Sequence, residues 1–233
     1  YQEGLRIPPT RLYSQGEKND TLFRIIEKNV RAPTLYFGDL RAQLSACHIA
    51  EEQFLDLIER HGRATVLELM DQLIDYAERM ARAAIAKLPD GIVSFEDWID
   101  DDGVDHGKPI RLFVTIKKTG AHFHVDWTGT APQARAAINN TLSFTKAASY
   151  AAIRCILDGD IPTNEGYFRC IDVKAEQGTV AWGELPAACA ARGLTGFRMI
   201  DCLFGALAQL VPDKVFAASD GGNTGISVGG YDA

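Results

Sequence analysis

The sequence lacks several features that would place it in a well-defined class of protein. It contains no run of about 18 apolar residues, so we expect no membrane span. Basic residues are fewer than acidic ones: the 24 Lys and Arg and the 31 Asp and Glu give a net charge of −7. Nucleic-acid binding requires clustered Lys and Arg that neutralise phosphates. An acidic chain without such a cluster argues against nucleic acid as the main partner.

Cysteine is sparse, and its spacing is not that of a disulfide or zinc framework. The number of cysteines is odd and no two of them have CxxC spacing, which argues against both kinds of site. We therefore expect reduced thiols and a cytoplasmic location. The five residues are Cys47, Cys155, Cys170, Cys189 and Cys202.

Common catalytic and nucleotide-binding motifs are also missing. The sequence contains no GxxxxGK[ST], GxSxG or HExxH motif. The glycine-rich run 221–225 lacks the spacing of a dinucleotide-binding loop. Motifs alone therefore indicate an α+β domain without a recognisable nucleotide site.

The composition is that of an ordinary globular protein, with 233 residues of which 46% are hydrophobic. The chain begins with Tyr1 rather than Met and stops in a glycine-rich run, 229–233. We therefore expect a piece of a longer protein, truncated at both ends. Under that expectation, the lack of a targeting segment carries little meaning.

The first part of the chain has helical periodicity. Residues 1–19 are rich in proline and turn formers, so we expect an extended segment followed by a short helix that Asp20 caps. A long helix is predicted from Asp39 onward, where apolar residues recur with a period near 3.6. A second is predicted to begin at a capping box of Thr65 and Glu68. Because only a short turn joins them, the two helices are expected to pack as an antiparallel pair.

From Gly91 onward the hydrophobic period changes from 3.6 to 2. An antiparallel sheet is predicted from strands over 92–98, 110–117 and 122–127. The remaining predicted elements are a helix opened by Pro132, a helix over 144–157, a fixed-shape loop over 161–166, a hairpin of 168–174 with 179–182, a helix over 199–211 and a glycine-rich loop over 217–223.

The predicted fold class is α+β, with a long antiparallel helix pair followed by antiparallel β-hairpins and packed helices. Residues 1–90 are expected to form a mainly helical region with an extended first segment. Residues 91–233 are expected to form a mixed α+β region of the same domain.

The stretch VDWTGTAPQARAAINN, residues 125–140, carries the most suggestive side chain. Asp126 ends a predicted strand, where a carboxylate can point into a cleft or can cap the following turn. His122 and His124 share its face, and imidazole with carboxylate can ligate zinc, iron or manganese. The alternative is a polar, solvent-facing side of a hairpin. The run Asp100-Asp101-Asp102 is interpreted as an acidic turn rather than a calcium loop.

Six blocks occur in this order along the chain: YQEGLRIPPTRLYSQGE, GDLRAQLSA, VDWTGTAPQ, IPTNEGYFR, LPAACAARG and DCLFGALAQLVPD. Together they resemble the hydantoinase B/oxoprolinase family, the B-type subunits of ATP-dependent N-methylhydantoinases. The resemblance extends over nearly the whole chain. Ala50 and Gln53 depart from it, and the two histidines of 122–124 are outside it.

The resemblance implies hydrolysis of a small cyclic amide within a hetero-oligomer. An A-type partner subunit would use ATP and Mg²⁺ to phosphorylate the substrate, and the B-type subunit would act on the activated intermediate. A divalent metal is expected in the part of the family's sequence that precedes Tyr1, so no residue of this chain is assigned as a metal ligand.

The resemblance also selects candidate site residues. In this interpretation a cleft brings together predicted catalytic residues and predicted substrate-binding residues, and backbone amides at the helix start near Pro132 hold an anion. The catalytic set is Asp126, Thr128, Asn139 and Asn164; the substrate-binding set is Asp39, Arg41, Gly129, Thr130 and Gly166.

Three alternatives stay open at this point. The first is a component of an acetone- or acetophenone-type ATP-dependent carboxylase. The second is a non-catalytic assembly region of such a complex. The third is an independent metal hydrolase that uses His122, His124 and Asp126.

Overall fold

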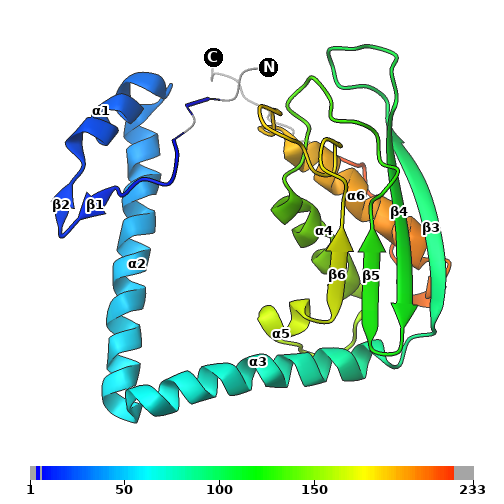
Figure 1. Ribbon diagram of the computed structural model, residues 1–233, viewed down its shortest axis with the longest axis horizontal. Coiled ribbons are helices and arrows are strands. Elements are labelled where there is room, and N and C mark those ends of the chain that lie inside the picture. The colour runs from blue at the N-terminus through cyan, green and yellow to red at the C-terminus, as the bar shows by residue number, and fades with distance from the viewer. Residues whose placement is uncertain (1–3, 6, 223–233) are drawn as a thin grey trace, which may run out of the picture. The chain divides into compact units, whose positions relative to one another are not determined.

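A computed structural model describes residues 4–5 and 7–222 of the chain (Figure 1). Parts of the predicted first segment and of the predicted glycine-rich loop lie outside the described residues, as does the terminal run 229–233. The chain divides into two compact units, one up to residue 72 and one from residue 73 onward. Each unit is described by itself.

The first unit begins with two short antiparallel strands, β1 (Tyr13–Ser14) and β2 (Glu17–Lys18). Helix α1 (Asp20–Asn29) follows and buries Leu22 and Ile26. Its N-cap is Asn19, whose side chain accepts a hydrogen bond from the Leu22 amide, rather than the predicted Asp20.

Helix α2 (Pro33–His61) begins six residues before the predicted Asp39, because Pro33 occupies the first turn, where a missing N–H costs nothing. None of its residues is buried, so its apolar stripe adds no buried residue to the described part of the first unit. Gly62, at φ +80°, separates it from α3 (Arg63–Ile85). Thr65 therefore lies inside α3, and the predicted capping box is wrong. The expected antiparallel packing of α2 and α3 concerns both units and stays a prediction.

The second unit contains a four-stranded sheet in the order β3-β4-β5-β6. The antiparallel hairpins of the first three strands are confirmed. The fourth strand pairs parallel to β5, so the sheet is mixed rather than purely antiparallel. The strands are β3 (Gly91–Ile99), β4 (Ile110–Thr119), β5 (His122–Asp126) and β6 (Ile171–Lys174).

The predicted hairpin of 168–174 with 179–182 is therefore wrong. The backbone of β6 bonds to the free edge of β5 instead, and the Phe123 amide donates to the Cys170 carbonyl at 3.0 Å. Thr179 makes only isolated bridges, to Pro132 and Trp182.

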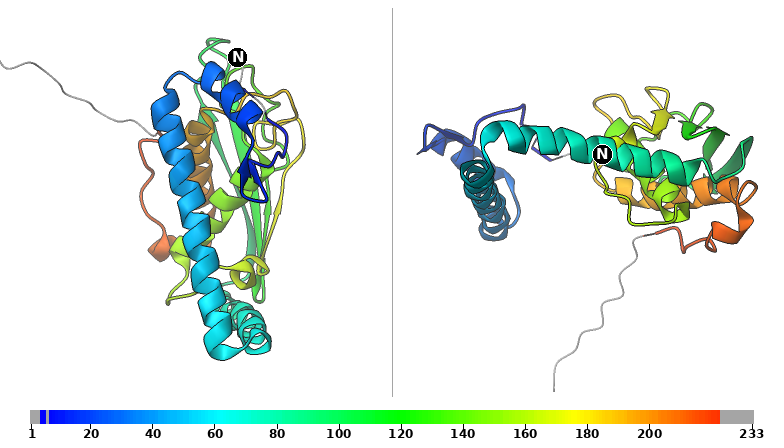
Figure 2. Two further views of the ribbon diagram at one scale, coloured as in Figure 1. Left: turned by 90° about the vertical axis from the view of Figure 1, so that its left-hand side faces the viewer. Right: turned by 90° about the horizontal axis from the view of Figure 1, so that it is seen from below.

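Two helices, α4 (Leu142–Ile156) and α6 (Arg192–Leu207), cover one face of this sheet (Figures 1 and 2). Alternate residues of β4 face these helices, and Leu112, Val114 and Ile116 are fully buried. Trp127 is also fully buried, and its indole N–H donates to Ser149 on α4. The predicted helix over 144–157 is thus confirmed, and the α+β class with it.

Other predictions on this unit need correction. No helix opens at Pro132, because the amides of this segment bond to distant loops: Gln133 donates to Gly178 and Asn140 to Val180. Helix α6 begins at Arg192, seven residues before the predicted start. The loop 161–166 runs into a one-turn helix, α5 (Glu165–Phe168), and a 3₁₀ turn, η1 (Pro212–Lys214), follows α6. Among the described helices, none is both long and apolar enough to cross a membrane.

Candidate functional site

A pocket of about 560 Å³ lies beside the end of β3 in the second unit. Ile138 brings the stretch 125–140 to this pocket, and Leu194 and Arg198 bring α6 to it. Its walls therefore combine an aromatic and aliphatic surface with carboxylates and one guanidinium. The lining residues are Trp98, Ile99, Asp100, Asp101, Asp102, Gly103, Ile138, Leu194, Arg198, Asp220 and Gly221.

Arg198 is the cation of this pocket, and carboxylates hold it in place. Its Nη2 donates to Oδ2 of Asp97 at 2.6 Å, and its Nη1 lies 3.6 Å from Oδ2 of Asp201. Asp201 is itself fixed by the amide and hydroxyl of Ser219, at 3.1 and 2.8 Å. A guanidinium carries more N–H donors than these two contacts use. Arg198 can therefore also donate to an oxygen of a molecule in the pocket.

The acidic stretch on the pocket wall is ordered by backbone amides, as expected for an acidic turn. Hydrogen bonds from the amides of Gly103 and Gly107 lower the pKa of Asp101. The amide of Asp105 likewise lowers the pKa of Asp102. Asp102 also accepts from the Ala136 amide at 3.2 Å, which fastens this turn to the stretch 125–140.

Asp126 lies on the face of the sheet opposite the helices, with 37% of its side chain exposed. Its Oδ1 accepts from the Thr128 amide at 2.8 Å, and its Oδ2 lies 3.1 Å from Nζ of Lys174. Burial raises the pKa of Asp126, but Thr128 and Lys174 outweigh this effect and hold the pKa below its usual range. The carboxylate is thus ionised, and it caps the turn that follows β5.

Gly129 and Thr130 shape that turn. Gly129 adopts φ +94°, a conformation that favours glycine, and a Cβ there would lie 3.3 Å from the Phe113 ring. The Thr130 hydroxyl is buried; it accepts from the Phe113 amide and donates to the Phe113 carbonyl, both at 3.2 Å. These contacts fasten the turn to β4.

Asn139 is fully buried and makes four hydrogen bonds to the backbone. Its Oδ1 accepts from the Ala134 amide, and its Nδ2 donates to the carbonyls of Ala134, Ala136 and Ala188 at 2.9–3.1 Å. The side chain therefore replaces the regular backbone hydrogen bonds that the loop 134–139 lacks.

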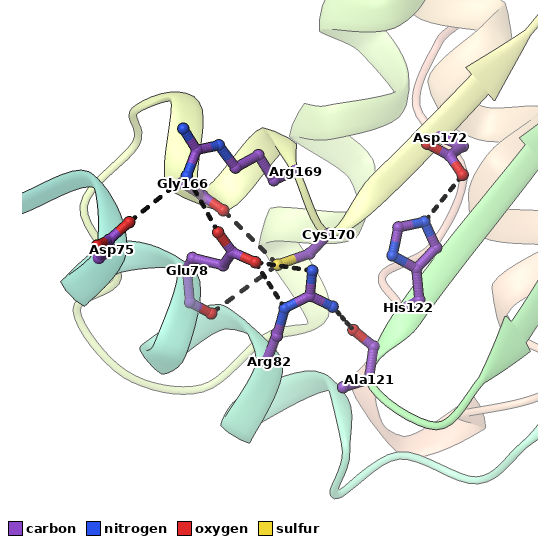
Figure 3. Close-up of polar contacts among 9 residues, drawn as sticks. All are labelled: Asp75, Glu78, Arg82, Ala121, His122, Gly166, Arg169, Cys170 and Asp172. Carbon is purple, nitrogen blue, oxygen red and sulfur yellow. Dashed lines mark hydrogen bonds and ion pairs between the residues drawn. The ribbon is translucent and has the colours of Figure 1, made fainter. Parts of the chain in front are cut away.

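Gly166 lies where α5 meets α3 (Figure 3), and Asn164 is the N-cap residue of α5. The Asn164 side chain caps α5 by accepting from the Gly166 amide at 2.9 Å. A Cβ at Gly166 would lie 1.9 Å from the carbonyl oxygen of Ile74, so only glycine allows this approach.

A cluster of charges beside Gly166 joins α3 to α5 (Figure 3). Glu78 accepts from Arg82 at 2.8 Å and from Arg169 at 3.3 Å, and Arg169 also lies 3.5 Å from Asp75. The hydrogen bond from Arg82, followed by that from Arg169, lowers the pKa of Glu78. The spacing of Glu78 and Arg82 on one helix indicates their pairing from sequence, but nothing in the sequence indicates Arg169.

Buried thiols are not positioned as nucleophiles. Burial raises the pKa of Cys202 to about 12, and it also raises the pKa of Cys170. Both therefore stay protonated near neutral pH, whereas a nucleophilic cysteine needs a lowered pKa.

The two remaining predicted residues, Asp39 and Arg41, belong to α2 in the first unit. Arg41 lines a separate pocket of about 310 Å³ there, together with Tyr13 and Phe23. Within the second unit, the predicted residues of 126–130 lie together. Those of 164–166 lie beside α3 instead, and the predicted asparagine at 139 is enclosed in its own loop.

The two histidines of β5 do not share a ligand set with Asp126. The third member of their group is Asp172 of β6, whose Oδ2 lies 3.0 Å from His122 and 3.1 Å from His124. The structure does not favour the alternative of a metal hydrolase that uses Asp126, because Lys174 and Thr128 engage that carboxylate.

Comparisons with known proteins agree over the whole chain. A sequence model of the family described as Hydantoinase B/oxoprolinase matches residues 1–233. The chain is 38% identical over 227 residues to the B component of a putative D-/L-hydantoinase of Pseudomonas sp. (strain NS671), covering 93% of this chain and 38% of that protein. It is 32% identical over 239 residues to the beta component of the caprolactamase of Pseudomonas jessenii, covering 100% of this chain and 40% of that protein.

Solved structures share the fold. The crystal structure of the ATP-dependent caprolactamase from Pseudomonas jessenii matches with a TM-score of 0.85 and 29% identity, over 92% of this chain and 37% of that chain. A nucleotide-free acetone carboxylase matches with a TM-score of 0.76 over 90% of this chain and 30% of that chain. At 11% identity, the second match shows the fold alone. The chain spans about 40% of the length of the curated relatives named above.

Proposed function

The chain belongs to the hydantoinase B/oxoprolinase family, and from this premise we propose that it is a portion of the B-type subunit of an ATP-dependent cyclic amide hydrolase. The observation that carries the proposal is the family match over all 233 residues. The fold shared with an ATP-dependent caprolactamase supports it, since a caprolactam is a cyclic amide.

We further propose that an A-type partner subunit uses ATP and Mg²⁺. The relatives are named as the B and beta components of their enzymes, so they work within assemblies of more than one kind of chain. This chain contains no GxxxxGK[ST] motif, which is consistent with nucleotide binding elsewhere in the assembly. An amide carbonyl is a poor electrophile. Transfer of a phosphoryl group from ATP to the amide oxygen gives ADP and an O-phosphorylated imidate, which water attacks more readily than it attacks the amide. The B-type subunit then receives an activated intermediate.

Within this portion, the pocket around Arg198 is our candidate for contact with the substrate. Trp98, Ile138 and Leu194 supply apolar surface for the carbon atoms of a ring. The Arg198 guanidinium, held by Asp97, can donate to a carbonyl or phosphate oxygen.

The residues selected from the family resemblance remain proposals as site residues. Asp126 with Thr128 stays the candidate for orienting a water molecule. Four other candidate residues bond to or pack against the backbone of this chain. Substituting any of them is expected to reduce stability before it affects activity. These residues are Thr130, Asn139, Asn164 and Gly166.

A substrate panel tests the proposal. The full-length protein that carries this chain would be purified with its A-type partner and incubated with ATP and hydantoin, 5-oxoproline or caprolactam, and in separate reactions with ATP, labelled bicarbonate and a ketone. We expect ATP-dependent ring opening of at least one cyclic amide, measured by chromatography. ATP-dependent fixation of labelled bicarbonate onto a ketone, without ring opening, would overturn the hydrolase assignment and favour the carboxylase alternative.

A further inference from the structure

Two histidines and an aspartate converge on the face of the sheet opposite α4 and α6. His122 Nε2 lies 3.0 Å and His124 Nδ1 lies 3.1 Å from the same oxygen, Oδ2 of Asp172. The candidate donor atoms all lie within 4.8 Å of one another. Figure 3 shows His122 on β5 pointing toward Asp172 on β6.

The sheet topology creates this convergence. Alternate residues of a strand share a face, so His122 and His124 lie side by side, with ring centroids 4.7 Å apart. The parallel register of β5 and β6 pairs His124 with Asp172. Three donors from two strands are thus placed by backbone hydrogen bonds rather than by mobile loops.

From this geometry we propose that His122, His124 and Asp172 form a binding site for a divalent transition-metal ion. Metal–ligand distances near 2.0–2.2 Å place tetrahedral donors about 3.3–3.6 Å apart. The two His–Asp separations of 3.0 and 3.1 Å approach this range, and all three donor atoms lie within 4.8 Å of one another. Water fills the remaining coordination positions, since only three protein donors are present in the group.

The donor set determines the class of ion. Imidazole suits Zn²⁺, Co²⁺, Ni²⁺ and Cu²⁺, whereas Mg²⁺ and Ca²⁺ prefer oxygen ligands throughout. Two lysines lie on neighbouring positions of the sheet: Lys174, which Asp126 neutralises at 3.1 Å, and Lys117, which pairs with His124 in register. Asp172 supplies the negative charge that a divalent ion needs.

The site also has a structural consequence. Strand β6 has four residues and forms the edge of the sheet, where β5 is its only partner among residues 7–222. An ion held by two β5 ligands and one β6 ligand cross-links this edge. Because the unfolded chain does not place these donors together, metal binding stabilises the folded protein.

Metal titration tests the site in the full-length protein after removal of bound metal with a chelator. Zn²⁺ per chain would be measured by elemental analysis, and Co²⁺ would be followed by its visible absorption. We expect the double variant His122→Asn/His124→Asn to bind one Zn²⁺ fewer than the wild type. Asp172→Asn is expected to weaken zinc binding by more than about tenfold.

The matched control is His48→Asn. His48 is an exposed histidine that pairs with a single carboxylate, Glu52, at 3.3 Å, so its loss should leave the zinc stoichiometry unchanged. All three proposed ligands are at least partly exposed, so circular dichroism of their variants should show intact folding. Equal zinc stoichiometry and equal cobalt spectra in the wild type, the double variant and Asp172→Asn would overturn the proposal.

Discussion

Gly166 lies so close to Ile74 that a Cβ at position 166 would be 1.9 Å from the Ile74 carbonyl oxygen. The same Cβ would lie 2.8 Å from the Glu78 amide nitrogen. The one-turn helix α5 therefore packs directly on the backbone of α3, where no side chain can move aside. The Glu78–Arg169 ion pair closes the same contact at 3.3 Å.

Gly166→Ala is expected to destabilise the protein by at least about 1–3 kcal/mol, because the added methyl group must displace backbone. The measurement is the urea midpoint of the full-length protein. Gly193→Ala is the matched control, since a Cβ at Gly193 in α6 meets nothing within 4 Å. That control should be neutral or stabilising by about 0.5–1 kcal/mol. Equal midpoints for the two variants would show that α5 does not pack against α3 as described.

Asn139→Ala is expected to cost about 1–3 kcal/mol, because it removes the side-chain partner of the Ala134 amide and of the carbonyls of Ala134, Ala136 and Ala188, of which the last still accepts from the Asn139 backbone amide. Asn139→Asp keeps the acceptor but directs a carboxylate at three carbonyl oxygens, so its loss of stability should be larger at neutral than at acidic pH. Thermal unfolding at both pH values measures this. Asn29→Ala, at an exposed asparagine, should change stability by less than about 0.5 kcal/mol.

The Asp126–Lys174 pair predicts a pH dependence. The pKa of Asp126 is lower in the folded protein than its ordinary value, so its contribution to stability is present above the ordinary aspartate range. That contribution is lost as the pH falls through the folded pKa. Lys174→Met should raise the pKa of Asp126, as measured by NMR titration of its carboxyl carbon. Lys117→Met removes an exposed lysine of β4 and should leave this pKa unchanged; equal shifts in both variants would contradict the pairing.

Arg198→Lys tests the pocket. The substitution keeps the charge but removes the planar fork that reaches both Asp97 and Asp201. We expect kcat/KM for ring opening in the assembled enzyme to fall by at least about tenfold, while circular dichroism stays unchanged. Arg135→Lys is the control, because Arg135 is 70% exposed and outside the pocket lining. Unchanged kcat/KM for Arg198→Lys would show that Arg198 does not contact the substrate in this pocket.

Local periodicity predicted much of the second unit. The alternation in β4 and β5 and the apolar pattern of α4 depend on nearby residues, and both were confirmed. The pairing of β6 with β5 could not be predicted, because the backbone of Phe123 bonds to that of Cys170 far along the chain. The absence of a helix at Pro132 could not be predicted for the same reason. The backbone amides of this loop donate to the Asn139 side chain and to carbonyls far along the chain.

The candidate site was harder to predict than the fold. The end of a predicted strand and the family resemblance pointed to Asp126, but Arg198 and Asp97 are in contact although no short sequence motif contains both. Asp172 was missed because its position beside the histidines depends on the parallel register. The family resemblance selected Asn139 and Gly166. The structure explains why these residue types are needed: Asn139 hydrogen-bonds to backbone groups, and Gly166 packs where a side chain would not fit.

The most direct test of the central claim measures ring-opened product and consumed ATP together in one reaction. The A-type partner alone, the full-length B-type protein alone and their complex would each be given ATP and the same cyclic amide. We predict that only the complex forms ring-opened product in step with ATP consumption. Ring opening at the rate of the complex by the partner alone, or by the B-type protein without ATP, would contradict the account.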